Sequence, residues 1–139
     1  MHIDEKELMS YENDLEVEVK DLFGRLKFGF IQRSKQIKTI KEHIMACPYR
    51  VIVCGDFNDL PYSYAYHQLK DILNNTFTKT GRGFGFTYNG KLPFLRIDNQ
   101  FYSKGIQAVS FQTVKSMKYS DHFPIVGTYT LTDNSSIIQ

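Results

Sequence analysis

The sequence predicts one α+β domain in which helices cover a sheet, and three observations point to this class. The chain has 139 residues, the length of a single domain or of part of one. Apolar residues make up 42% of it and aromatic residues 14%, so it can bury a sizeable core. Helical and strand-like apolar patterns then follow one another in the order α, α, β, α, loop, β, β, β. No repeat, low-complexity tract or linker divides residues 1–139.

Two helices are expected before the first strand. Asp4–Glu7 has the spacing of a capping box, and apolar residues then recur at helical spacing, so residues 4–23 are predicted to be helical. Residues 1–23 form an acidic lead-in, with eight acidic residues against two lysines. Gly24 and Gly29 are expected to loosen the chain, and a second helix is predicted from about residue 30 to residue 45.

The first strand and the third helix follow. Arg50–Cys54 is a short, continuously apolar and β-branched run, which is typical of a strand that is buried on both faces. Ser63 is a suitable N-cap for a helix that extends to about Leu73. The chain has two cysteines, Cys47 and Cys54, which are too few for a disulfide framework and have no further zinc ligands beside them. We expect both to be small buried hydrophobic residues.

The second half of the chain is predicted to be a loop followed by strands. Residues 74–95 hold four glycines among threonines and aromatic residues, as a long surface loop does. Residues 96–103, 108–114 and 125–131 have strand patterns. Residues 133–139 are expected to be a frayed tail.

Charge and hydropathy limit the kinds of partner. Residues 1–23 carry a net charge of −6 and the rest of the chain carries +8. A basic body suits an anionic substrate, such as a phosphate ester or a nucleic acid, although ordinary surface lysines explain the same excess. No signal-peptide pattern and no apolar run of membrane-spanning length is present, so a soluble chain is expected.

Two polar pairs stand next to strands. Asp56 and Asn58 directly follow the first strand, where a carboxylate can position a water and a carboxamide can donate to a phosphorane oxygen. An Asx turn that closes the strand explains them equally well.

Asp121 and His122 precede the last strand: the carboxylate suits Mg²⁺, and the imidazole can contact a phosphate oxygen. A turn histidine with a capping aspartate is the alternative.

A third aspartate lies inside a strand-like run. Asp98 follows Arg96 in such a run, where an unpaired carboxylate is costly. An imidazole N–H from His122 would stabilise it and would fix the tautomer of the ring. Pairing with Arg96 or with the backbone is the alternative.

The three motifs together resemble one protein family. Gly-Asp-Phe-Asn from residue 55, Arg-Ile-Asp from residue 96 and Ser-Asp-His-Phe-Pro from residue 120 occur in the order found in the endonuclease/exonuclease/phosphatase, or DNase I-like, family. The resemblance extends from about Gln32 to Leu131 and includes Gly-Phe-Gly-Phe-Thr-Tyr from residue 83.

The resemblance implies roles for five residues. Asp56 would orient or activate the attacking water, and Asn58 would stabilise the transition state. His122 would contact the scissile phosphate, and Asp98 would pair with this histidine. Asp121 would lie near the metal, which is Mg²⁺ or Mn²⁺ in this family.

The resemblance also implies the architecture. The family fold is a four-layer α/β/β/α sandwich, and residues 1–139 would be its C-terminal half, with one mixed sheet of about four strands covered by helices. The N-terminal half of the family holds a metal-binding glutamate on a strand. Glu5 and Glu7 stand in a polar helical start and do not replace it, and His2 is at most a remnant of a family strand end.

Residues after Asp98 depart from the family pattern. Asn99 and Gln100 stand where an aromatic and an aliphatic residue are usual, which predicts altered packing of the strand but leaves Asp98 in place.

The function expected from this resemblance is metal-dependent hydrolysis of a phosphate ester. The chain alone is expected to be weakly active or inactive, because it lacks a principal metal ligand. Its partners would be the phosphate ester, the missing half of the domain and, through an exposed sheet face, a second copy. A non-catalytic binding module with relic site residues is the alternative, and a DNA-binding nuclease is a third interpretation.

Overall fold

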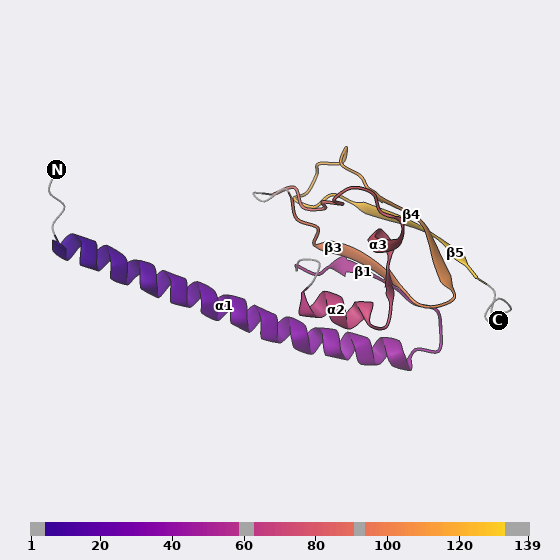
Figure 1. Ribbon diagram of the computed structural model, residues 1–139, viewed down its shortest axis with the longest axis horizontal. Helices are drawn as coiled ribbons and strands as arrows, with labels where there is room; N and C mark the ends of the chain where they lie inside the picture. The colour runs from indigo at the N-terminus through magenta and orange to yellow at the C-terminus, as the bar shows by residue number, and fades with distance from the viewer. Residues whose placement is uncertain (1–4, 59–62, 91–93, 133–139) are drawn as a thin grey trace. The chain divides into compact units, whose positions relative to one another are not determined.

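The computed structural model describes residues 5–58, 63–90 and 94–132. Two compact units divide the chain, residues Met1–Gln36 and Ile37–Gln139. The first contains most of the long helix α1 (Glu5–Ala46), and the second contains the last turns of that helix and all of the sheet structure (Figure 1). The capping box of Asp4 and the predicted tail at 133–139 lie outside the described residues.

Helix α1 is continuous where two helices were predicted. Gly24 and Gly29 do not interrupt it. A glycine inside a helix costs only about 1 kcal/mol relative to alanine, which a long helix can absorb. The prediction of a break was therefore wrong, because it gave each glycine more weight than its helix propensity carries.

The last turns of α1 pack beside helix α2 (Tyr64–Lys70) in the second unit (Figure 1). Ile37 is buried there with Leu69. The ammonium of Lys41 donates to Gln68 at 3.0 Å and lies 3.9 Å from a carboxylate oxygen of Asp71. Helix α2 begins as predicted, since the hydroxyl of its N-cap residue, Ser63, accepts a hydrogen bond from the N–H of Tyr66 at 3.2 Å.

The strands of the described residues form two antiparallel sheets. Strand β3 (Asp98–Tyr102) lies between β1 (Ile52–Asp56) and the two-residue β2 (Asn74–Asn75). Strands β4 (Ile106–Thr113) and β5 (Ile125–Leu131) form the second sheet.

The predicted α+β class, as half of a DNase I-like sandwich, is confirmed, but the prediction of one mixed sheet was wrong, since the described strands form two antiparallel sheets. Parallel neighbours need a crossover of about a dozen residues or more. Strands β3 and β4 are separated only by residues 103–105, and β4 and β5 by residues 114–124, so these connections favour reversals of direction.

Strand β1 is more exposed than its sequence predicts. Its continuous apolar run indicated burial on both faces, yet Ile52 is 44% exposed and Cys54 is exposed as well. Strand β1 is an edge strand among the described residues, with β3 as its one neighbour. The prediction that Cys54 is a buried hydrophobe was therefore wrong.

The main core lies between the helices and the three-stranded sheet. Phe101 and Leu69 are fully buried, and the rings of Phe57 and Tyr66 each meet Phe101 edge-on. A smaller buried cluster joins Tyr102 of β3 to Ile106 and Ala108 of β4, and Tyr129 of β5 packs against it.

A short helix replaces part of the loop that was expected at 74–95. Helix α3 (Thr76–Thr80) is capped by Asn75, whose side-chain oxygen accepts from the N–H of Thr78 at 3.0 Å. Among the described helices, none combines the length and the apolar character that a membrane span requires.

Candidate functional site

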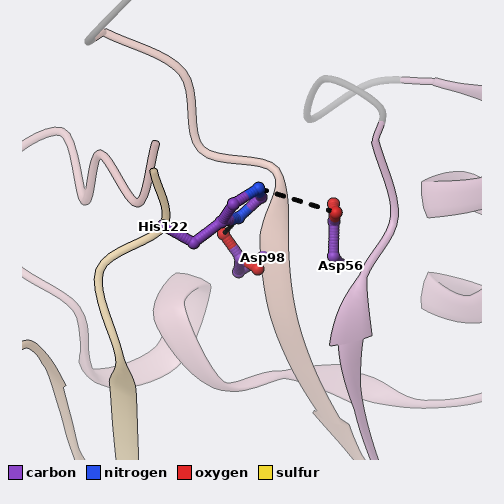
Figure 2. Close-up of side chains that lie close together, drawn as sticks. All are labelled: Asp56, Asp98 and His122. Atoms are coloured by element: carbon purple, nitrogen blue, oxygen red, sulfur yellow. Dashed lines mark hydrogen bonds and ion pairs between the residues drawn. The ribbon is translucent and has the colours of Figure 1, made fainter. Parts of the chain in front are cut away.

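Two carboxylates meet at one end of the three-stranded sheet. Asp56 ends β1 and Asp98 begins β3, and the antiparallel register places their Cα atoms opposite each other. His122 reaches the same place from the segment before β5. Figure 2 shows the three side chains pointing toward one another from three separate segments of the chain.

The predicted pairing of Asp98 with His122 is present. Their Nδ1 and Oδ2 atoms lie 2.9 Å apart. Because an ionised carboxylate only accepts hydrogen bonds, Nδ1 carries a proton and donates a hydrogen bond to Asp98. Arg96, which was the alternative partner, places its guanidinium carbon 3.9 Å above the ring of Phe77.

The other ring nitrogen of His122 faces Asp56. Nε2 lies 3.8 Å from an Asp56 carboxylate oxygen, which is ion-pair distance when the imidazole is charged. The hydrogen bond to Asp98 is the main reason that the pKa of His122 is raised above its usual value of 6.5. Partial burial lowers this pKa, while the negative charges of Asp98, Asp56 and Asp121 add to the increase.

Asn58 helps to hold Asp56 through its backbone. Its N–H donates to Asp56 Oδ1 at 2.7 Å, and its φ of 46° lies in the left-handed region that asparagine tolerates. The Asx turn that was the alternative reading of this pair is therefore present, and it orients the carboxylate. The catalytic role of the Asn58 side chain stays a prediction.

Asp121 stands apart from the three-residue group. Its carboxylate accepts from the hydroxyl of Ser120 at 3.1 Å and is exposed. Within the described part of the chain, the ligand atoms that lie within 4.8 Å of one another belong to Asp56, Asp98 and His122. The predicted metal ligation by Asp121 stays a prediction.

A cleft of about 290 Å³ opens over this group. Gly55 and the segment Phe123–Ile125 complete its lining. A larger hollow of about 640 Å³ lies elsewhere, between α3, the loop at residues 82–86 and β4, and none of the described residues that line it bears a carboxylate or an imidazole. The smaller cleft is therefore the candidate for chemistry.

Part of this donor set suits a divalent cation. Asp56 and Asp98 supply carboxylate oxygens, which are the ligands that Mg²⁺ and Mn²⁺ prefer. His122 already donates Nδ1–H to Asp98, and imidazole is a poor ligand for Mg²⁺. The residues fit such an ion through their carboxylates, with His122 left to contact a phosphate.

Asn99 and Gln100, the two residues of β3 that depart from the family pattern, both form hydrogen bonds with polar side chains of other segments. Asn99 accepts a hydrogen bond from the side chain of Asn75 at 3.2 Å, and Gln100 accepts one from the hydroxyl of Tyr129 at 2.8 Å. The amide of Gln100 also lies 3.5 Å from the carbonyl of Ile125, so it links β3 to β5.

The site also contains Tyr88, to which the sequence motifs assign no role. The ring of Tyr88 meets the His122 ring edge-on, with centroids 5.4 Å apart, and the two residues form an isolated β-bridge. The sequence signal that could have indicated Tyr88 is an aromatic residue that follows a threonine shortly before the Arg-Ile-Asp motif.

One family model matches the chain. It is described as the endonuclease/exonuclease/phosphatase family, and it matches residues 37–122. No curated protein shows significant sequence similarity to the chain.

Several solved structures share the fold. A conserved protein of unknown function from Enterococcus faecalis V583 has a TM-score of 0.61 and 19% identity, over 71% of this chain and 44% of that one. The catalytic domain of human Nocturnin has a TM-score of 0.53 and 23% identity, over 76% and 42%. A mannosyl-6-phosphatase from Bacteroides thetaiotaomicron VPI-5482 has a TM-score of 0.52 and 21% identity, over 71% and 44%. The chain thus spans less than half the length of these structures.

Proposed function

This chain belongs to the endonuclease/exonuclease/phosphatase family, and from that premise we propose that it carries part of a metal-dependent site that hydrolyses a phosphate ester. The observation that supports the proposal most strongly is the convergence of Asp56, Asp98 and His122 at one cleft. Titratable groups that gather at a cleft and perturb one another's pKa are typical of functional sites, and His122 lies here between two carboxylates.

The proposed role of His122 is to bind the phosphate group. Its raised pKa, caused mainly by the hydrogen bond to Asp98, increases the share of the imidazolium form, in which Nε2–H donates to a phosphate oxygen. Asp98 holds the ring in the orientation that points Nε2 into the cleft. Asp56 accepts a proton from the attacking water, or orients that water, because its carboxylate lies beside the same nitrogen.

The proposed cation is Mg²⁺ or Mn²⁺, held through carboxylates of the site, with Asp121 as a further ligand. When bound, it would stabilise the negative charge that develops on the phosphate. Asn58, next to Asp56, would contribute its side-chain amide to the same charge.

We further propose that this chain is weakly active or inactive by itself. The chain covers 42–44% of the length of the Enterococcus, Nocturnin and mannosyl-6-phosphatase structures. The family resemblance implies a metal-binding glutamate in the N-terminal half of the domain. Among the described strands β1 has one unpaired edge, and this edge and exposed apolar residues such as Ile52 and Val126 would accept that half, or a second copy of this chain.

Calorimetry with MgCl₂ and a simple phosphate monoester or diester tests the proposal. A competent site binds both, and binding of the ester is lost in Asp56→Asn and in His122→Gln. A protein that binds neither would contradict the proposal and would favour the alternative, a binding module with relic site residues. Light scattering tests self-association, which a clean monomer would contradict.

A nucleic-acid substrate is a second candidate, favoured by the larger hollow. Phe84 is 80% exposed and stacks on Phe86 at 5.3 Å, and Arg82 and Lys115 line the same hollow. Exposed aromatic rings beside cations are suited to stacking bases and to contacting the backbone phosphates. A steep loss of oligonucleotide binding with rising salt would support this candidate, and a flat salt dependence would count against it.

A further inference from the structure

The hydrogen bond between Asp98 and His122 joins two parts of the fold that share no strand ladder. Asp98 begins β3 in the three-stranded sheet, whereas His122 precedes β5 in the two-stranded sheet. The short distance of 2.9 Å between them requires a connection that fixes both backbones near the site.

Thr87 makes this connection on the Asp98 side through its side chain. Its hydroxyl oxygen accepts the backbone N–H groups of Ile97 and Asp98, each at 3.1 Å. The backbone N–H of Thr87 donates to the carbonyl of Leu95 at 2.9 Å. Thr87 is fully buried, so water cannot replace the hydroxyl oxygen as the acceptor for these two donors.

The backbone around Thr87 makes the connection on the His122 side. Its carbonyl accepts the N–H of Phe123 at 2.7 Å, and the N–H of Asn89 donates to the carbonyl of Asp121 at 2.6 Å. These two bonds flank the β-bridge between Tyr88 and His122. Residues 87–89 therefore lie between the two segments and bond to both.

We propose that Thr87 is a positioning residue that sets the distance between Asp98 and His122. A threonine suits this position because it offers an acceptor oxygen to two neighbouring N–H groups while its carbonyl holds the opposite segment. Without the hydroxyl, the N–H groups of Ile97 and Asp98 would be buried without this partner, and the start of β3 would shift away from the imidazole. The consequence for hydrolysis rests on the proposed function, but the geometry does not.

Nuclear magnetic resonance of the histidine rings tests this role in the unliganded protein. The chain has four histidines, and His122→Gln assigns the signal of the residue in question. The downfield Nδ1–H resonance of wild-type His122 reports its hydrogen bond to Asp98. Thr87→Val keeps the shape of the side chain but removes the acceptor, and it is expected to abolish this resonance. Thr87→Ser keeps the hydroxyl and is expected to retain it.

Thr76→Val is the matched control. Thr76 is also fully buried, and its hydroxyl bonds to that of Tyr129 at 2.8 Å, away from the dyad. This variant is expected to lower the melting temperature while it leaves the His122 resonance unchanged. A purely structural role for Thr87 would make the two valine variants behave alike.

Folding of each variant is checked by its thermal transition. If Thr87→Val does not fold, Thr87→Cys takes its place, because a thiol is a weak acceptor of similar size. A folded valine or cysteine variant with the wild-type resonance overturns the proposal, and so does loss of the resonance in Thr87→Ser. Since neither metal nor ester is present, these outcomes are independent of whether the chain hydrolyses phosphate esters.

Discussion

Strand β3 carries two kinds of polar side chain, which differ in charge, in burial and in the partners that they bind. Asp98, at its start, pairs with a partly exposed imidazole beside an open cleft. Asn99 and Gln100, in its middle, are only 2% and 8% exposed and bond to neutral partners.

The difference between these regions follows from the cost of burying charge. A buried ion is expensive unless it is paired, whereas a neutral amide needs only hydrogen bonds. The charged groups therefore lie at the rim, where a phosphate and water can reach them, and the neutral amides join β3 to its neighbours. Changes at the rim should alter chemistry more than folding, and changes in the middle should do the reverse.

The largest effect is expected at the rim. His122→Gln removes the group that donates to the phosphate, so residual ester hydrolysis should fall by about 100-fold or more, as measured by phosphate release. The melting temperature should change little. His43→Gln, at an exposed histidine in the last turn of α1, should leave both quantities unchanged. Equal losses in the two variants would show that the measured activity does not arise at this site.

The next effect is expected at Gly127, opposite the middle of β3. An added Cβ would overlap the side-chain oxygen of Gln100 and would lie 2.7 Å from the hydroxyl of Tyr129. Gly127→Ala should therefore destabilise the fold by about 1–3 kcal/mol through overpacking, as measured by chemical denaturation. Gly55→Ala is a stability control, since its Cβ would meet no described atom within 4 Å. A similar loss in the free energy of unfolding for both variants would contradict the claim that a side chain at position 127 crowds Gln100 and Tyr129.

A smaller effect separates Gln100 from Asn99. Gln100→Leu removes the bonds to Tyr129 and Ile125 and should cost about 1–2 kcal/mol in the free energy of unfolding. Asn99→Leu should cost less, because the amide nitrogen of Asn99 is already buried without a hydrogen-bond partner among the described residues. A larger loss of stability for Asn99→Leu than for Gln100→Leu in urea denaturation would contradict the proposed link between β3 and β5.

The smallest effect is a pH dependence of stability from His122. Its pKa is raised in the folded state, chiefly by the hydrogen bond to Asp98. The resulting stabilisation is therefore fully present below the unfolded value near 6.5 and is lost as the pH rises through the folded pKa. Urea denaturation of the metal-free protein should show this decline, and Asp98→Asn should flatten it. An unchanged profile in Asp98→Asn would show that another group causes the decline.

Local patterns in the sequence predicted much of the fold. The apolar runs located β1, β3, β4 and β5, and Ser63 marked the start of α2. The family resemblance was confirmed. The need of a carboxylate inside a strand for a partner, together with the resemblance, correctly predicted the pairing of Asp98 with His122.

Other features depend on contacts that no local pattern encodes. The exposure of Cys54 follows from the edge position of β1. The burial of Gln100 depends on Tyr129, 29 residues away. Thr87 bonds to backbone groups of residues 95, 97, 98 and 123, and backbone groups leave no pattern in the sequence.

Titration with Mn²⁺ in the presence of inorganic phosphate, followed by paramagnetic broadening of amide resonances, tests the central claim most directly. The acidic residues 1–23 provide an internal competitor, because they attract cations without a formed site. We expect resonances of residues 55–58, 97–99 and 121–123 to broaden at lower Mn²⁺ concentrations than those of the acidic segment. Broadening that begins in residues 1–23, or that never reaches His122, would contradict the assignment of these three segments to one metal and phosphate site.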